Sequence, residues 1–125
     1  MNILFLDDDN NRTRLARQWF MKHNLLTAET AEEAKEILIS NPRFDLAMLD
    51  HDLGGKVYCP SDENSGYDVA LFISLMNREF MPKQVIVHSF NPTGARKMVS
   101  VLSDADIPVE HIPFGRNPIH PNNYQ

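Results

Sequence analysis

The stretch Ile3-Leu4-Phe5-Leu6-Asp7-Asp8-Asp9 is a short apolar run that ends abruptly in three aspartates. A run of this kind, with no alternating polar residues, is typical of a central parallel strand, because both faces of such a strand are buried. Residues 44–49 repeat the pattern and end at Asp50. The two stretches predict buried parallel strands whose carboxyl ends are acidic, and this prediction decides the class of fold.

Outward from these strands, helical and strand patterns alternate along the chain. Thr30 and Glu33 form a capping box that starts one helix, and Asn91-Pro92 suits the N-cap and first position of another. Further strands are expected at 25–28, 84–88 and 107–112, a loop at 54–64, and helices at 10–23, 31–40, 65–80 and 92–102. We therefore predict one flavodoxin-like α/β domain, a doubly wound parallel sheet in the strand order 2-1-3-4-5.

The composition fits a single globular domain. The chain has 125 residues, of which 42% are hydrophobic and 23% charged, values that are ordinary for such a domain. A net charge of −5 argues against broad binding to nucleic acids or membranes, but not against a small anionic ligand. The single cysteine, Cys59, cannot form an internal disulfide, and no apolar run is long enough to span a membrane. We expect a cytoplasmic protein without a membrane partner.

The acidic residues at the two strand ends are expected to form one site. In open α/β sheets, ligands bind beyond the carboxyl ends of the strands, where the strand order reverses. Asp7, Asp8, Asp50 and Asp52 should meet there, and two carboxylates about 4 Å apart repel by roughly 4 kcal/mol at an effective dielectric near 20. A hard divalent cation would relieve this repulsion, and oxygen ligands favour Mg²⁺ or Mn²⁺. A set of separate, solvated aspartates is the alternative.

The same residues carry a resemblance. An apolar strand that ends in Asp7-Asp8, an arginine-bearing helix and then Leu46-Ala47-Met48-Leu49-Asp50 resemble the receiver domain of two-component signalling. The resemblance covers residues 1–114 and leaves residues 115–125 as a C-terminal tail. It implies that Asp7 and Asp8 hold Mg²⁺ and that Asp50 accepts a phosphoryl group.

Three departures from the receiver pattern follow Asp50. Where receivers have a hydroxyl residue at the end of strand four, this chain has His88-Ser89, and either residue can take that place. Where receivers have a lysine before a proline after strand five, this chain has Ile112. The last receiver helix is missing, so we expect uncovered apolar surface beside strands one and five, over which the tail or a second subunit would lie. We favour a homodimer through this face.

The replacements favour catalysis. His51 lies between two aspartates in the sequence, and His88 lies beside Ser89. Two histidines that face a metal could act as general acid and general base near neutral pH. Strand alternation, however, could point His51 away from the flanking carboxylates. The expected catalytic residues are Asp50, His51, His88 and Ser89.

A second anion-binding element follows these residues. Asn91-Pro92-Thr93-Gly94-Ala95-Arg96 predicts a helix N-terminus in which Thr93, Gly94 and Arg96 bind phosphate. For Arg96, an ordinary exposed charge is an equal alternative. Together with residues 49–55, 63–68 and 88–91, this segment resembles the cyclic-phosphate-processing receiver domain, a divergent branch of the receiver superfamily whose proposed action is on cyclic phosphate ends in RNA repair.

Four functions are compatible with these features. The first choice is a metal-dependent, phosphoesterase-like enzyme that processes the cyclic or terminal phosphate of a small molecule or an RNA end. The second is a stand-alone receiver that is phosphorylated on Asp50 and has no turnover of its own. A haloacid-dehalogenase-like phosphatase would use Asp7 and Asp9, but Asn10 departs from that family's motif. The last is a degenerate receiver that only binds.

Overall fold

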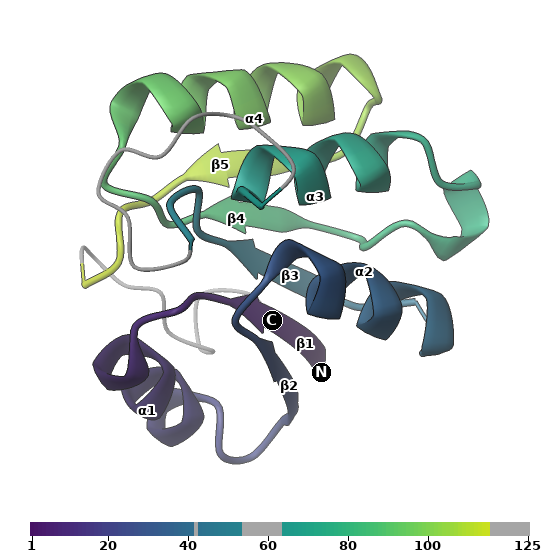
Figure 1. Ribbon diagram of the computed structural model, residues 1–125. Helices are drawn as coiled ribbons and strands as arrows, with labels where there is room; N and C mark the ends of the chain where they lie inside the picture. The colour runs from purple at the N-terminus through teal and green to yellow at the C-terminus, as the bar shows by residue number, and fades with distance from the viewer. Residues whose placement is uncertain (42, 54–63, 116–125) are drawn as a thin grey trace.

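The computed structural model describes residues 1–41, 43–53 and 64–115 (Figure 1). Most of the predicted 54–64 loop and of the 115–125 tail lies outside this part. The strands are β1 (Asn2–Leu6), β2 (Asn24–Ala28), β3 (Leu46–Leu49), β4 (Val85–Val87) and β5 (Val109–His111). The helices are α1 (Asn10–Trp19), α2 (Ala31–Ser40), α3 (Gly66–Ser74) and α4 (Pro92–Asp104), with a 3₁₀ turn, η1 (Arg78–Phe80), after α3.

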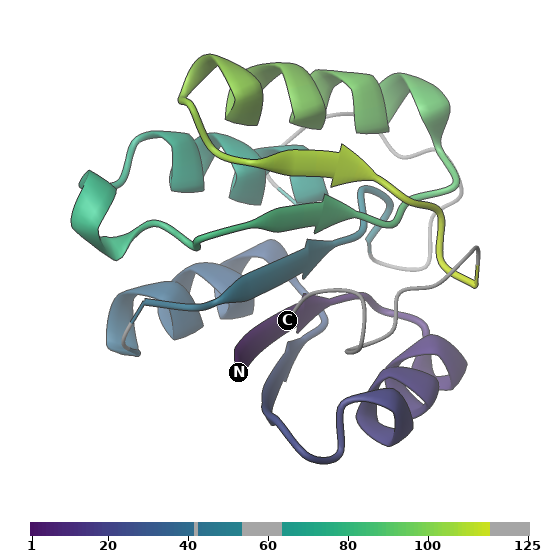
Figure 2. The same ribbon diagram turned by 180° about the vertical axis from the view of Figure 1, so that it is seen from behind.

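All strand pairs are parallel, and the sheet order is β2-β1-β3-β4-β5, so the predicted topology is confirmed. Helices α2, α3 and α4 cover one face of the sheet and α1 covers the other (Figures 1 and 2). Alternating side chains of β1 supply the two layers: Leu4 and Leu6 pack toward α2–α4, whereas Ile3 and Phe5 pack toward α1. None of the helices in the described ranges combines the length and apolarity needed to cross a membrane.

The face of the sheet on the α1 side differs from the expectation of exposed apolar surface. Its apolar strand residues are at most 1% exposed: Ile3, Phe5, Leu46, Met48 and Ile86. Trp19 and Phe114 stack on each other within the same cluster, with ring centroids 4.9 Å apart. The homodimer remains a prediction, but these side chains do not supply the exposed surface on which it was based.

Several predicted element ends are wrong by a few residues. The apolar period after Gly66 predicted one helix through Phe80, but α3 ends at Ser74 and Asn77 has an extended ψ of 138°. The chain then forms the short turn η1, and Met81, which precedes a proline, is extended as such residues usually are. The apolar period continues past the end of the helix because Met76, which follows α3, also packs on the core, whereas the side chains of η1 are exposed.

Candidate active site at the carboxyl ends of the strands

The parallel register places three ionisable residues in one row. The last residues of β1, β3 and β4 are partners across the sheet, so Asp7, Asp50 and His88, which follow them, are neighbours on the same face. Two further backbone bonds continue the ladder into this row, from Asp50 N to Leu6 O and from His88 N to Leu49 O, each 3.0 Å. The row reaches β5 at Ile112, where a receiver would carry lysine.

Asp7 is the centre of the hydrogen-bond network. Its two carboxylate oxygens accept four hydrogen bonds: from Asp9 N (2.9 Å), from Arg12 Nη2 (3.0 Å) and Nε (2.7 Å), and from His88 Nε2 (2.9 Å). Burial of Asp7 opposes its ionisation, but the hydrogen bonds from His88 and Arg12 outweigh that effect and lower its pKa to about 2. Asp7 is therefore an anion at any physiological pH.

Arg12 is the site residue that sequence reasoning missed. Its guanidinium donates two hydrogen bonds to Asp7. The guanidinium also lies 3.6 Å from both Asp9 Oδ2 and Asp50 Oδ2, and 5.9 Å from the centroid of the Phe90 ring. The hydrogen bonds to Asp7 raise the pKa of the guanidinium above its usual value. A signal was available, because side chains in the first turn of a helix point back toward the preceding strand end.

Asp50 is buried like Asp7, but fewer hydrogen bonds compensate the negative charge of its carboxylate. Its side chain is 7% exposed, and within the described residues it accepts one hydrogen bond, from His51 N at 2.9 Å. Burial raises the pKa of Asp50 to about 6; the neighbouring Asp7 adds to the rise, and His88 and Arg12 oppose it. Within the row of Asp7, Asp50 and His88, called the acidic row below, Asp50 thus has less positive charge nearby than its ionised form requires.

His88, and not Ser89, faces the site. Its ring stacks on Phe5 with centroids 4.9 Å apart, and its Nε2 donates to Asp7, because a carboxylate can only accept. Its Nδ1 is buried and has no hydrogen-bond partner among the described residues. Ser89 Oγ instead accepts from Asn91 N at 3.0 Å, in the turn before α4.

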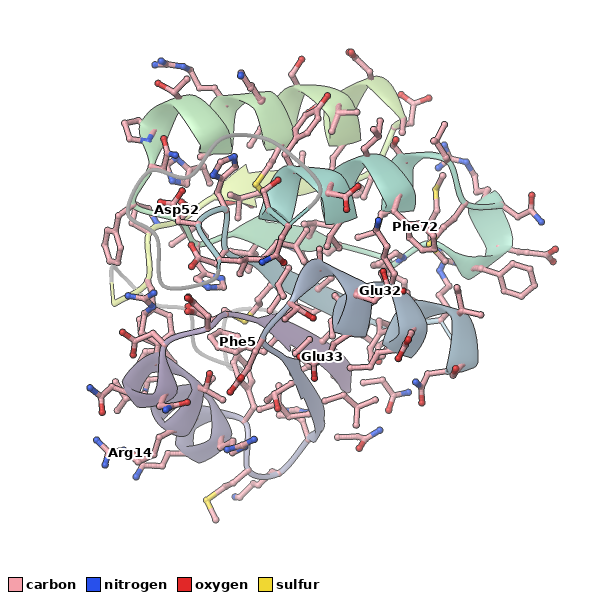
Figure 3. All side chains as sticks on the ribbon, in the orientation of Figure 1. Phe5, Arg14, Glu32, Glu33, Asp52 and Phe72 are labelled. Carbon is pink, nitrogen blue, oxygen red and sulfur yellow. The ribbon has the colours of Figure 1, made fainter. Side chains whose placement is uncertain are left out.

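His51 links the starts of α3 and α4. Its carbonyl oxygen accepts from Gly66 N at 2.9 Å, and its Nδ1 lies 2.9 Å from Asp52 Oδ1, which also accepts from Asn91 Nδ2 at 3.1 Å. The imidazole fills the space beside Gly94, where an added Cβ would lie 2.5 Å from ring atoms. Figure 3 shows Asp52 beyond the end of β3 and beside the start of α4. The structure thus gives His51 a packing role on the α4 side of the sheet.

Three side chains in the described part of the chain offer metal ligand atoms within 4.8 Å of one another: Asp7, Asp50 and His88. Of the predicted ligands, Asp8 and Asp52 are half-buried and stand outside this group. The poorly compensated carboxylate of Asp50, beside the ionised carboxylate of Asp7, fits a divalent cation. Asp7 already accepts four hydrogen bonds, two of them from Arg12, so a cation that binds Asp7 would have to displace one of these donors. The carboxylate oxygens of Asp7 and Asp50 suit Mg²⁺ or Mn²⁺.

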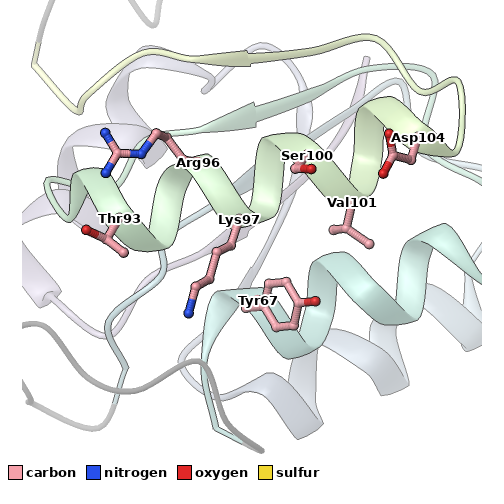
Figure 4. A pocket seen from close by; sticks show the side chains of 7 residues that line it. All are labelled: Tyr67, Thr93, Arg96, Lys97, Ser100, Val101 and Asp104. Carbon is pink, nitrogen blue, oxygen red and sulfur yellow. The ribbon is translucent and has the colours of Figure 1, made fainter.

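The predicted phosphate-binding residues lie along the first turns of α4. Gly94 is buried, and its N–H donates to Asn91 Oδ1 at 3.0 Å as part of the helix cap. Thr93 and Arg96 are exposed and line a groove between α3 and α4 together with Lys97 and Tyr67 (Figure 4). The structure therefore separates the glycine, which packs against His51, from the two exposed side chains.

Comparison with known proteins supports the resemblance drawn from the sequence. The family described as "Cyclic-phosphate processing Receiver domain" matches residues 2–104. No curated protein matches the chain.

Among solved structures, the fold is similar to the CheY-like response regulator receiver domain from Methanospirillum hungatei JF-1, at 21% identity, TM-score 0.63 and coverage of 94% of this chain and 83% of that one. The BeF3-activated N-terminal receiver domain of Klebsiella pneumoniae RstA shares 16% identity with a TM-score of 0.66, over 94% of this chain and 89% of that one. The Francisella response regulator 1452 receiver domain shares 16% identity with a TM-score of 0.63, over 91% and 85%. At these identities the likeness establishes the receiver fold.

Proposed function

Because this chain belongs to the family of cyclic-phosphate processing receiver domains, we propose that it is a metal-dependent phosphoesterase acting on a cyclic or terminal phosphate, of a small molecule or of an RNA end. The observation that carries the proposal is His88. A buried imidazole hydrogen-bonded to Asp7 stands in the acidic row, at a place where a receiver has a hydroxyl residue. An imidazole can transfer a proton near neutral pH, and hydrolysis requires proton transfer, whereas a phosphorylation switch does not.

The proposed step is hydrolysis of a cyclic phosphodiester. A water oxygen forms a new bond to phosphorus, and one of the two ring ester bonds breaks. The proton of the water passes to the ionised carboxylate of Asp50. The departing oxygen takes a proton from doubly protonated His88, whose Nε2–H is donated to Asp7 in the free protein, and His88 is left as the neutral imidazole. The ligand atoms of these two side chains lie within 4.8 Å of each other and of Asp7, so both could reach one bound phosphate.

Asp7 and Asp50 would hold Mg²⁺ or Mn²⁺, with Asp8 next to Asp7 in the chain. When bound, the metal would neutralise phosphate oxygens and lower the pKa of an attacking water. Release of Arg12 from Asp7 would free a guanidinium fork that matches a phosphate. Its position over Phe90, at the edge of the row, keeps it within reach of the site.

A signalling role is the second candidate, because Asp50 ends β3 as the phosphorylated aspartate of receivers does. The solved receiver structures that share the fold belong to response regulators. Against this role, Ile112 stands where the receiver lysine would contact the phosphoryl group.

Hydrolysis of a 2′,3′-cyclic mononucleotide with Mg²⁺ or Mn²⁺ tests the proposal. We expect turnover by the wild type, loss of turnover in His88→Ala, and retention in His111→Ala. His111 is a matched control because it ends β5 outside the acidic row, is exposed, and contacts Ser89 O at 2.8 Å. Absence of turnover with every metal would refute the proposal.

A parallel incubation with a small phosphodonor and Mg²⁺, followed by mass spectrometry, tests the second candidate. A stable gain of one phosphoryl group that is lost in Asp50→Asn would favour signalling. Turnover without such a gain would favour the phosphoesterase.

A further inference from the structure

An apolar groove of about 520 Å³ lies at the edge of the sheet opposite to the acidic row. Its walls come from the ends of α2 and α3 and from η1, and Figure 1 shows these ends on the side away from the arrowheads of the strands. A groove of this volume with a mainly apolar lining can hold a small ligand or several side chains of a partner. We call it the α2–η1 groove; its apolar lining residues are Leu38, Ile39, Phe72, Met76 and Phe80.

The α2–η1 groove is a fixed feature of the fold. Arg43 Nε donates to Met81 O at 2.7 Å, which joins the segment before β3 to the residue after η1. Arg78 Nη2 donates to Ala105 O at 2.5 Å, which joins η1 to the end of α4. On the α3 wall, Phe72 packs against the core. Because its walls are held in this way, a partner can bind the groove without first ordering it.

Exposed apolar side chains surround the groove. Ile39 is 70% exposed and Phe80 is 54% exposed, although both line it. Leu71 and Leu75, one turn apart within and at the end of α3, are exposed as well. Seven large hydrophobic side chains are exposed in the described part of the chain, and four of them therefore belong to α2, α3 and η1. Such a cluster marks an interaction surface, and a groove beside protruding apolar side chains can receive the same side chains of a second copy.

Two opposite charges line the same groove, and they indicate which partner fits it. Arg43 and Glu79 are both exposed, and neither makes an ion pair with the other or with any further residue that the structure describes. A partner of one charge sign would be repelled by one of these two residues. About a two-fold axis, however, Arg43 of each copy can face Glu79 of the other, so that both charges are paired twice. Charge complementarity therefore favours a second copy of this chain.

We propose that two copies of this chain associate through the α2–η1 groove about a two-fold axis. Phe80 of each copy enters the groove of the other, and Arg43 of each pairs with Glu79 of the other. The acidic row stays open in both copies, because it lies at the opposite edge of the sheet. This surface is distinct from the sheet face on the α1 side, and the proposal does not depend on the proposed function.

The test is sedimentation equilibrium over a range of micromolar concentrations, with circular dichroism to confirm that each variant folds. We expect a wild-type dimer that Phe80→Ser weakens about 30-fold or more, as truncation of a buried aromatic anchor does. Arg43→Glu and Glu79→Arg should each weaken it about tenfold, because each reverses one charge in two pairs. The double variant with both changes should dimerise to within about threefold of the wild type. Met21→Ser is the matched control, because Met21 is exposed and follows α1; it should change the dimer constant less than about twofold.

Three results would overturn the proposal. A wild type that stays monomeric throughout the range leaves the groove to another occupant, such as an apolar ligand. A dimer that Met21→Ser dissociates and Phe80→Ser does not places the interface on the α1 side. Single charge variants that weaken the dimer without recovery in the double variant exclude the reciprocal pairs of Arg43 and Glu79. None of these results involves turnover, so the proposed function is tested separately.

Discussion

Replacement of Asp50 by asparagine should stabilise the metal-free protein at neutral pH, although Asp50 is central to the candidate site. Burial raises the pKa of this carboxyl from 3.8 to about 6, which means that the folded protein disfavours its ionised form. Asparagine has a similar shape and keeps an oxygen for the hydrogen bond from His51 N, but it cannot ionise. The substitution therefore removes a buried charge that the fold does not fully compensate.

The magnitude follows from linkage between ionisation and folding. The shift from 3.8 to about 6 is about two pKa units, and each unit corresponds to about 1.36 kcal/mol. Because the folded-state pKa is the higher one, the stability supplied by protonated Asp50 is complete below pH 3.8 and is lost as the pH rises through 6. The advantage of Asp50→Asn should grow from about 0.5 kcal/mol at pH 4 to about 3 kcal/mol at pH 8.

Urea denaturation from pH 4 to pH 8, in the presence of a chelator, measures this difference. Asp45→Asn is the control, because Asp45 accepts from Asn2 N at 2.8 Å, a bond that lowers its pKa. Loss of the Asp45 charge should lower stability above pH 4, the opposite sign. Addition of Mn²⁺ should narrow the gap between Asp50→Asn and the wild type, since a ligand stabilises the protein that binds it.

A gap between Asp50→Asn and the wild type that is independent of pH would refute this reasoning, because the shift in the pKa of Asp50 would then be absent. A less stable variant at pH 8 would contradict it more strongly. That result would mean that the Arg12 guanidinium, 3.6 Å away, already compensates the charge of Asp50.

Four other predictions are open to measurement. His88→Ala should lower turnover of a cyclic mononucleotide by about 10²–10⁴, the usual contribution of a proton-transfer group. Arg12→Gln should tighten Mn²⁺ binding in calorimetry, because it frees Asp7, and should destabilise the metal-free protein by about 1–3 kcal/mol; weaker metal binding would show that Arg12 does not compete. Gly94→Ala should cost about 1–3 kcal/mol in chemical denaturation, and less in a His51→Ala background, where the clashing ring is gone. Light scattering should report a dimer if the sheet face on the α1 side is an interface, and a monomer at micromolar concentration would contradict that.

The sheet order was predictable from sequence because the two acidic strand ends follow uninterrupted apolar runs. Such runs indicate strands buried on both faces, and alternation with helices then leaves few topologies. The ends of elements were less predictable. The apolar pattern continues at Met76, past Ser74, the last residue of α3, so periodicity alone does not mark where this helix ends.

The pairing register of the strands shows which residues of the site lie together, a question that the sequence had left open. His88 and Ser89 are adjacent, and only the pairing of β4 with β3 shows that His88 shares the row of Asp50. His51 follows Asp50 and packs on the opposite side of the sheet against Gly94, as the alternation of side chains allows. The first turn of a helix favours side chains that point back toward the preceding strand end, but spacing alone does not specify that the long side chain of Arg12 folds onto Asp7.

Arg12 also bears on why a receiver scaffold could become a catalyst. Asp7 already accepts four hydrogen bonds, two of them from the guanidinium, so a cation can bind Asp7 in exchange for Arg12. Under the proposed function, that exchange places a metal between the carboxylates and leaves the arginine free beside the arriving phosphate. Metal and phosphate should then bind cooperatively, because each favours the same position of Arg12. A receiver that relies on a lysine from β5 has no need of this exchange, whereas this chain, with Ile112 in that place, needs another cation for the phosphate oxygens.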